Sequence, residues 1–355
     1  MTILYLNLAL VFIFSLTARY FAVPVTVTDS MSIVKPSKFW IMLGLLSLVL
    51  VSGLRNTIGD TYFYMHAYEI HDFTWDRILN NKDIGFGILQ MILQQFSEDA
   101  QVMIFVTALI TNVLIVLTLY KYARLIEVAL YVYVTSGLFL VSMNGIRQFL
   151  AASIVFAATK YIFEGKWKRF MLVVLFASTF HQSALILIPI YFLVRREAWT
   201  KLTFMLLVVA VLIVLGYNQF TQLLFSAIED TQYGHYVGFE GEGASVIRIA
   251  VSAAPLALAF LGREKLRELS PKSDYIVNLS LLNLLFMIIS SQNWIFARFT
   301  IYFGLYQLVL IAWIVKLFKE KDQKLIYITI LISYFIYFFY EHVISLNISY
   351  RSPYL

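Results

Sequence analysis

The sequence predicts an all-α, polytopic integral membrane protein with about ten full transmembrane helices and one re-entrant or broken helical hairpin. Three observations support this fold class. Of the 355 residues, 61% are hydrophobic and only 14% are charged, which leaves no room for a sizeable soluble domain. Apolar runs such as residues 3–20 and 102–119 approach the roughly 20 residues that a helix needs to cross a bilayer. Lysine and arginine fall in short clusters between these runs, which is the pattern of cytoplasmic loops.

The predicted spans follow one another from the N-terminus with two long connections. They lie at residues 3–22, 39–54, 102–119, 126–143, 147–163, 202–216, 246–262, 275–291, 298–316 and 324–341. The first run lacks a basic stretch before it and a small-residue cleavage site after it. We therefore expect it to remain as a helix rather than to be removed as a signal. Residues 1–355 then form a single membrane domain.

Basic clusters between the spans predict the topology, because cytoplasmic loops carry an excess of lysine and arginine. The clusters are Arg19, Lys35 and Lys38; Lys121 and Arg124; Lys166, Lys168 and Arg169; Arg195, Arg196 and Lys201; Arg263, Lys265, Arg267 and Lys272; and Lys316, Lys319, Lys321 and Lys324. Alternating spans place every cluster inside, except across residues 170–194, which have basic clusters at both ends. Two half-helices that meet near residues 179–183 as a re-entrant hairpin remove the conflict. The alternative is one long helix whose flanks violate the charge rule.

The hairpin topology places both termini and two long loops outside. The first loop, residues 55–101, has apolar side chains at helical spacing over residues 83–96, which predicts an interfacial amphipathic helix. Within the same loop, residues 61–75 interleave aromatic side chains with carboxylates. Aromatic faces suit sugar rings, but this composition is more typical of the aromatic belt at a membrane surface. The second extracytoplasmic loop is residues 217–245.

Several function classes lack support in the sequence. The net charge of +6 is spread over loop clusters rather than one face, so we expect no nucleic-acid partner. The chain has no cysteine, which removes disulfides, thiolate chemistry and cysteine metal sites. His66, His71 and Asp72 match no standard ligand spacing, so no metal site is predicted. The chain also has no Walker motif, dinucleotide fingerprint or nucleophile elbow, so we expect no cofactor and no ATP-driven step.

Three arginines, Arg55, Arg147 and Arg298, lie at the edges of apolar runs on the predicted outer side, where the positive-inside rule predicts few. We expect Asn144 to cap a helix that carries Arg147 in its first turn, where backbone N–H groups attract anions. Arg298 follows a similar helix start, and Arg55 ends a span of the opposite direction. Together the three guanidiniums could hold a pyrophosphate. The alternative is that each one snorkels to lipid headgroups.

Two residues are candidates for a general base. His181 lies in an otherwise apolar stretch, and a neutral imidazole can accept a hydroxyl proton near physiological pH. Asp60 follows Arg55 by five residues. The alternatives are a structural histidine that bonds Ser178 or Ser183, and an aspartate that forms a turn or pairs with an arginine.

Four strings of residues, in order along nearly the whole chain, carry a resemblance to a known family. They are Gly53-Leu54-Arg55 with Gly59-Asp60 and Tyr62; Asn144-Gly145-Ile146-Arg147-Gln148; Phe180-His181-Gln182-Ser183-Ala184-Leu185; and Ala297-Arg298-Phe299. Together they resemble the EpsG family, which is similar to the Wzy-type polymerases of bacterial exopolysaccharides. One departure concerns the acid, because the order Gly-x-Asp-Tyr appears here as Gly59-Asp60-Thr61-Tyr62.

The resemblance implies a membrane glycosyltransferase, similar in fold to the type C class, in the cytoplasmic membrane of a bacterium. It would transfer an oligosaccharide from undecaprenyl diphosphate to a lipid-linked acceptor on the outer face, without a required metal. Arg147 and Arg298 would stabilise the leaving group, and His181 or Asp60 would accept the proton. Arg55, Asn144, Gln148 and Tyr62 would bind substrate. The expected partners are the lipid-linked oligosaccharide, the lipid bilayer, and polysaccharide export and chain-length machinery.

Two other functions would also need outward cations near lipid-linked sugars. A flippase or transporter should carry polar groups through the middle of several spans, whereas here the unusual charges gather at one face. A ligase-type transferase would deliver the group to a different acceptor.

Overall fold

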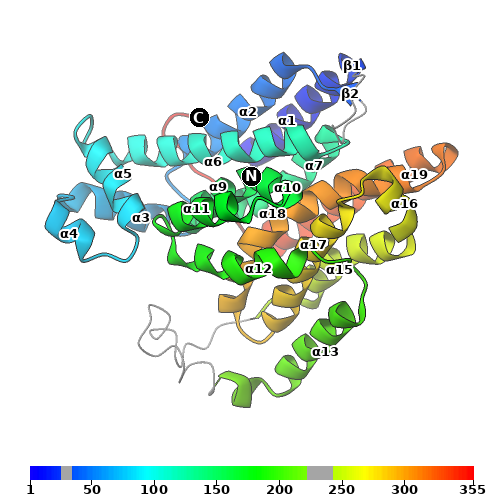
Figure 1. The fold of residues 1–355 in the computed structure, drawn as a ribbon. Coiled ribbons are helices and arrows are strands. Elements are labelled where there is room, and N and C mark those ends of the chain that lie inside the picture. Colours follow the sequence, from blue (N-terminus) through cyan, green and yellow to red (C-terminus); the bar gives the residue numbers. More distant parts are fainter. Residues whose placement is uncertain (25–33, 222–242) are drawn as a thin grey trace.

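The structure, a computed structural model, describes residues 1–24, 34–221 and 243–355 and consists almost entirely of helices (Figure 1). The α-helices are α1 (Thr2–Tyr20), α2 (Lys38–Gly53), α3 (Thr61–Ile70), α4 (Trp75–Leu79), α5 (Ile84–Gln94), α6 (Ala100–Tyr122), α7 (Ile126–Thr135), α8 (Leu138–Asn144), α9 (Ile146–Ala157), α10 (Thr159–Glu164), α11 (Trp167–Ser178), α12 (Leu187–Val194), α13 (Lys201–Leu215), α15 (Val246–Leu261), α16 (Arg263–Leu269), α17 (Ser273–Ile289), α18 (Ala297–Ile314) and α19 (Glu320–Phe338). The short helical segments are the 3₁₀ turns η1 (Gln182–Ile186), η3 (Trp294–Phe296) and η4 (Val315–Leu317), and the π-helix η5 (Phe339–Ser345). Two short strands, β1 (Val23–Pro24) and β2 (Val34–Lys35), pair antiparallel.

Helices occupy each of the ten stretches in which the sequence predicts a transmembrane span. Four segments of the described chain are long and apolar enough to cross a membrane: Thr2–Tyr20, Ala100–Tyr122, Trp294–Leu317 and Glu320–Ser345. Two bent helix pairs, α7 with α8 and α15 with α16, raise this number to six if each pair is one span. The all-α membrane class is confirmed, whereas the number of about ten spans is not.

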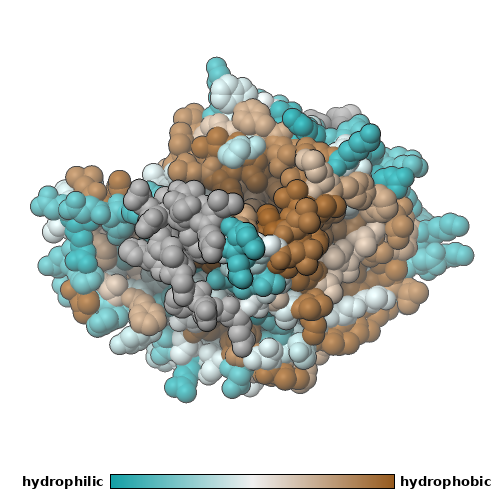
Figure 2. Space-filling model, turned by 90° about the horizontal axis from the view of Figure 1, so that it is seen from below, coloured by the Kyte–Doolittle hydropathy of each residue, from teal (hydrophilic) through white to brown (hydrophobic). Residues whose placement is uncertain are grey.

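The apolar surface of the molecule forms a band between polar ends. On the face shown in Figure 2, apolar side chains cover much of the middle, and polar side chains gather at the left and right. Many large apolar side chains of α1, α13 and α19 are exposed, among them Ile13, Leu212 and Ile336. Such a surface is costly in water, and a bilayer would cover it.

The predicted span at residues 126–143 is broken rather than continuous. Its two parts, α7 and α8, meet at an angle of 55°. Gly137 lies at the break with a φ of 84°, and a Cβ there would come within 2.3 Å of His342 Nε2. Glycine is therefore the residue that fits this left-handed turn. The sequence interpretation treated residues 126–143 as one span, although Thr135, Ser136 and Gly137 interrupt the apolar pattern at the break.

The basic loops meet at one end of the molecule, which we call the basic end. The bonds that join them run from Tyr120 to the Pro36 carbonyl, from Arg124 to the Leu269 carbonyl and from Arg267 to the Ala198 carbonyl. The loops that follow α1, α6, α12 and α16 therefore lie together.

The opposite end, which we call the site end, holds the predicted site residues. Helix α6 connects the two ends, because Gln101 in its first turn donates to the Gly53 carbonyl at 2.6 Å, whereas Tyr120 near its last turn reaches Pro36. The C-terminal residues also lie at the site end, where Arg351 O accepts from Asn56 N at 3.1 Å.

Helix α18 lies at the centre of the bundle. Every side chain from Thr300 to Ile314 is buried, and the helix packs against α7, α9 and α17. A helix that is apolar on all sides is expected to be surrounded by other helices. Its first turn carries Arg298, so the core fixes the backbone of one predicted site residue.

Residues 170–194 fold back on themselves. The chain reverses between α11 and η1, and the rings of Phe170 and Tyr191 lie 5.1 Å apart. A continuous helix would separate these two residues by about 30 Å at roughly 1.5 Å per residue. A Cβ on Gly165 would come within 2.9 Å of Arg195 Nη2, so both flanks of the hairpin lie together near the basic end. The broken helical hairpin is the arrangement that the structure contains, not the single long helix.

Residues 55–101 form the short helices α3, α4 and α5, which lie together at the left of Figure 1. Helix α5 docks on the tip of the hairpin, where Gly85 N donates to Thr179 O at 2.7 Å. A Cβ on Gly85 would come within 2.2 Å of Thr179 Oγ1, so this close approach requires glycine. The interfacial position of this helix stays a prediction. In the second predicted loop, residues 222–242 lie outside the described residues.

Candidate active site

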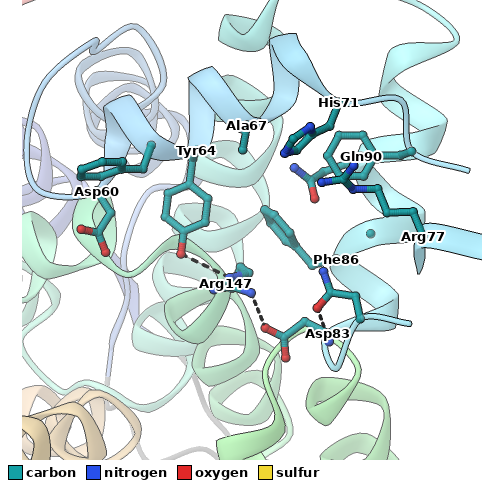
Figure 3. Close-up of a pocket in the computed structure, with 13 residues that line it drawn as sticks. Asp60, Tyr64, Ala67, His71, Arg77, Asp83, Phe86, Gln90 and Arg147 are labelled. Carbon is teal, nitrogen blue, oxygen red and sulfur yellow. Dashed lines mark hydrogen bonds and ion pairs between the residues drawn. The ribbon is translucent and has the colours of Figure 1, made fainter. Parts of the chain in front are cut away.

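A cavity of about 530 Å³ opens among α3, α4 and α5 at the site end (Figure 3). Its volume lies within the range of roughly 300–1,000 Å³ that is usual for ligand pockets. Aromatic, charged and amide side chains line it: Asp60, Phe63, Tyr64, His71, Phe73, Arg77, Asn81, Asp83, Phe86, Gln90 and Arg147. Of the sequence-predicted site residues, Asp60 and Arg147 line this cavity.

Arg147 lies in the first turn of α9 and enters the cavity beside Tyr64. Its Nη1 donates to Asp83 Oδ2 at 2.6 Å, and its Nε donates to Tyr64 Oη at 3.3 Å (Figure 3). The guanidinium carbon also lies 5.7 Å from the centre of the Tyr64 ring. The side chain is 36% exposed, so a ligand in the cavity can reach it.

Asp83 precedes α5 and joins the cavity to the hairpin. Its Oδ1 accepts from Gln182 N at 3.4 Å, while its Oδ2 accepts from Arg147. Burial raises the pKa of Asp83 above its ordinary value, although Arg147 and the Gln182 amide act in the opposite direction. The carboxylate therefore loses hydration through burial, and the ion pair with Arg147 offsets part of that loss.

His181 lies at the hairpin tip, between α11 and η1 and outside both helices. Its Nδ1 accepts from Ser183 N at 3.3 Å and lies 2.7 Å from Ser183 Oγ. Because a backbone N–H can only donate, Nδ1 carries the lone pair and Nε2 carries the proton of the neutral ring. Burial lowers the pKa of His181, and the charges of Arg147 and Arg298 lower it further, so the ring is neutral.

Polar contacts around Ser183 fix this ring. Gln148 Nε2 donates to Ser183 Oγ at 3.2 Å, and Tyr302 Oη lies 2.7 Å from the same oxygen. Gln148 and Tyr302 can thus both donate to Ser183, which donates its own hydroxyl proton to His181 Nδ1. The structure therefore places Gln148 inside the site as a partner of Ser183 rather than on the cavity wall.

Arg298 lies in the first turn of α18. Its backbone carbonyl accepts from Gln148 Nε2 at 2.9 Å, and its guanidinium carbon lies 4.7 Å from the centre of the Trp294 ring. Asn293 caps the preceding 3₁₀ turn by accepting from Ile295 N at 3.0 Å. Gln148 thus links the start of α18 to Ser183, the hydrogen-bond partner of His181.

Arg55 is only 2% exposed and bonds protein groups on three sides. Its Nε donates to Thr61 Oγ1 at 3.0 Å, its Nη2 donates to Met143 O at 2.6 Å, and its Nη1 donates to Ser52 O. Burial lowers the pKa of Arg55 to about 9, which leaves it charged at neutral pH. These contacts tie α2 to α3 and α8, whereas its predicted role in substrate binding stays a prediction.

Asn144 does not cap the helix of Arg147, so that expectation is wrong. Gly145 precedes α9, which has no side-chain cap. Asn144 Oδ1 instead accepts from Asp60 N at 2.9 Å. Gly59 makes this contact feasible, because its φ is 53° and a Cβ there would come within 2.0 Å of Asn144 Oδ1. Asn144 therefore positions Asp60 at the cavity.

Tyr62 lies outside the cavity lining. Its ring is 64% exposed and stacks on His66, with ring centres 5.8 Å apart. The neighbouring Tyr64 faces the cavity instead, because residues two apart on a helix point in different directions.

Sequence reasoning missed several cavity residues, chiefly Asp83, Tyr64 and Arg77. Asp83 lies 64 positions from Arg147 and carried no motif of its own. A possible signal was its place directly before the helix predicted at residues 83–96. The aromatic stretch at residues 61–75 was interpreted mainly as a membrane belt, yet Phe63, Tyr64 and Phe73 line the cavity.

Within the described ranges, no three histidine, aspartate or glutamate side chains gather closely enough to hold a metal ion. Metal independence of the reaction stays a prediction.

The fold and the site define a polytopic helical membrane protein with a cation-bearing cavity at one end. Over residues 38–354 the chain matches the EpsG family, and it therefore belongs to that family. This confirms the resemblance drawn from the sequence strings. Comparisons with curated proteins and with solved structures gave no match. The matched stretch includes every predicted site residue, from Arg55 to Arg298.

Proposed function

We propose that this protein polymerises the lipid-linked oligosaccharide repeat units of an exopolysaccharide or O-antigen-type polymer. It transfers the glycan from undecaprenyl diphosphate to a lipid-linked acceptor on the outer face of the bacterial cytoplasmic membrane. Membership of the EpsG family supports the polysaccharide class. The single observation that carries the proposal is that hydrogen bonds tie both arginines to the hairpin tip that carries His181, beside a cavity of about 530 Å³. Arg147 is tied through Asp83 to Gln182, and Arg298 through Gln148 to Ser183.

The proposed reaction breaks the bond between the anomeric carbon of the donor glycan and the diphosphate oxygen. A hydroxyl oxygen of the acceptor sugar bonds to that carbon, and its proton leaves to a base. The leaving group, undecaprenyl diphosphate, gains negative charge as the bond breaks. Arg147 and Arg298 suit this charge, because guanidiniums bind phosphate oxygens bidentately and stabilise charge that develops on a leaving group.

His181 acts in this proposal as a hydrogen-bond donor. Its Nδ1 is occupied by Ser183, and its Nε2 has no protein partner within the described residues and is not sealed from solvent. A neutral N–H at the hairpin tip can donate to a diphosphate oxygen without adding a further positive charge to those of Arg147 and Arg298. Of the two candidate bases, His181 is therefore the weaker one, because a ring whose lone pair is already engaged is a poor proton acceptor.

Asp60 is the base in this proposal. It lines the cavity, and its side chain has no hydrogen bond or ion pair within the described part of the chain. Its backbone is held by Asn144. A carboxylate fixed at its backbone and open to the cavity can accept the proton of an acceptor hydroxyl.

The distribution of charge supports the outward orientation of the site. Basic loops meet at one end of the bundle, and the cavity opens at the other. The positive-inside rule then assigns the basic end to the cytoplasm. The same orientation, with the site end outside, follows if about ten spans alternate in direction and residues 170–194 form a hairpin.

The test is an in vitro reaction of the purified protein, reconstituted in vesicles, with its lipid-linked repeat unit. We expect a ladder of products that differ by one repeat, resolved by gel electrophoresis. Relocation of the lipid across the bilayer without a ladder would instead identify a flippase. Transfer of a single repeat to a different acceptor would identify a ligase-type transferase. The control is the D60N variant in the same vesicles, because it lacks the carboxylate that we propose as the base.

A further inference from the structure

We propose that the end of the cavity around Arg77 binds a sugar that carries a carboxylate, such as a uronic acid of the repeat unit. This inference deepens the proposed function and rests on it, because it names the chemical class of the glycan. The two ends of the cavity differ in their charged groups, and that difference carries the argument.

Arg77 is the cavity cation without a protein counter-ion. It lies on α4, is exposed, and lines the cavity. Within the described residues it has no hydrogen bond or ion pair. Arg147, the other guanidinium of the lining, is paired with Asp83. An unpaired guanidinium on a pocket wall favours an anionic ligand group, because its five N–H donors match the two oxygens of a carboxylate.

The two ends of the cavity carry different side chains, as Figure 3 shows. Asp60, Tyr64 and Arg147 lie on one side, and Arg77, His71 and Gln90 lie on the other. If Asp60 accepts the proton of the acceptor hydroxyl, the glycan extends from Asp60 along the cavity toward Arg77. The diphosphate belongs to the Arg147 side, where Asp83 links Arg147 to the hairpin tip beside His181. The charge recognised at Arg77 therefore belongs to the sugar and not to the carrier lipid.

The aromatic and amide side chains of the lining also suit a sugar. Phe73 and Phe86 offer aromatic faces to the C–H groups of a ring, and Gln90 offers an amide. Gln90 is buried and its Nε2 lies 3.4 Å from Met103 Sδ, a weak acceptor, so a sugar hydroxyl would be a better partner. The position thus combines apolar faces, an amide and one guanidinium, which fits a hexuronate better than a neutral hexose.

The experiment measures binding without turnover. Purified protein in lipid nanodiscs is titrated with a glucuronosyl-glucose disaccharide and with the neutral glucosyl-glucose disaccharide of the same linkage, followed by saturation-transfer NMR. We expect the wild type to bind the acidic disaccharide about tenfold more tightly at low salt, the gain from one charge-assisted bidentate contact. We expect R77Q to bind both disaccharides equally, with the neutral one unchanged.

The matched control is K82Q, which removes the same charge from the same outer region at an exposed residue that does not line the cavity. It should retain the preference for the acidic disaccharide. Equal binding of both disaccharides by the wild type, no binding of the acidic one, or equal losses in R77Q and K82Q would each overturn the proposal. Failure of polymerisation in the reconstituted reaction is a separate result, because the binding preference needs no transfer.

Discussion

Asp83 and Arg147, 64 positions apart in the chain, form an ion pair with 2.6 Å between Oδ2 and Nη1. The pair fastens the start of α5 to the start of α9 and occupies the guanidinium that the proposed diphosphate needs. Asp83 therefore competes with the substrate for Arg147. The first prediction follows from this competition.

Replacing Asp83 by asparagine should strengthen the binding of inorganic pyrophosphate about fivefold, as expected when a partly exposed guanidinium is released from its ion pair. Burial raises the pKa of Asp83, so its carboxylate takes up a proton at a higher pH than a free aspartate. As pH falls through that raised value, the wild type should approach the affinity of D83N. Calorimetric titrations of both proteins over the same pH range measure this. Protonation of pyrophosphate also changes its affinity with pH, and the D83N titration measures that change alone. Wild-type and D83N affinities that stay equally far apart at every pH would contradict competition between Asp83 and pyrophosphate for Arg147.

Replacing Arg147 or Arg298 by alanine should lower polymer yield about 100-fold or more, because each removes a preorganised donor to the leaving group. Complementation of a strain that lacks the gene, with polymer length read on gels and protein level on blots, measures the effect. R169A, at an exposed position near the basic end, is the matched control and should be unaffected. Unchanged polymer in both R147A and R298A at normal protein levels would rule out the mechanism.

Variants of His181 separate a donor from a base. A glutamine side chain places an amide N–H near the position of Nε2, whereas asparagine places its amide near Nδ1. If His181 donates from Nε2, H181Q should keep roughly a tenth of the activity, and H181A and H181N should lose about 100-fold. The reconstituted reaction measures all three rates. Equal loss in H181Q and H181A would instead favour proton acceptance by the ring.

Arg55 should act on stability more than on the reaction, because its guanidinium bonds the Met143 carbonyl and Thr61 inside the protein. R55Q should cost roughly 1–3 kcal/mol for each buried group left unpaired. Thermal unfolding in detergent, followed by tryptophan fluorescence, measures the loss. R351Q is a control at an exposed arginine of the same end. A melting curve like that of the wild type, combined with lost activity, would restore Arg55 to substrate binding.

Single cysteines report the topology cleanly, because the chain has none of its own. A membrane-impermeant maleimide should label E98C in intact cells, and should label E197C and E268C only after lysis. Glu98 lies at the site end, and Glu197 and Glu268 are exposed residues of the basic end. Labelling of E268C from outside but not of E98C would contradict the hairpin and the outward orientation.

The sequence alone was sufficient for the helices, and it named two of the residues that line the cavity, Asp60 and Arg147. Long apolar runs predict helices wherever they occur, and each predicted stretch is helical in the structure. The charge pattern around residues 170–194 also led to a hairpin, because a single crossing would have violated the distribution of lysine and arginine. The bend at Gly137 was not predicted, because the apolar residues farther out on both sides indicated one continuous span. Its local signal is the run Thr135-Ser136-Gly137, which interrupts the apolar pattern.

The partners of the site residues were beyond sequence reasoning for a physical reason. Motifs report residues that are neighbours in the chain, whereas the Asp83 pair and the Tyr302 contact with Ser183 span 64 and 119 positions. Asn144 illustrates the limit, because its position before a helix predicted a cap, and the fold uses its amide oxygen for Asp60 instead.

The sequence by itself determined that this chain is a helical membrane protein of the EpsG family and that Arg147, His181 and Arg298 belong to one end of it, because hydropathy, charge placement and motif order are properties of the chain. The tertiary structure decided what each side chain faces. Packing buried Arg55, turned Tyr64 rather than Tyr62 toward the cavity and engaged Nδ1 of His181. Those outcomes depend on contacts between distant segments, which no local pattern encodes.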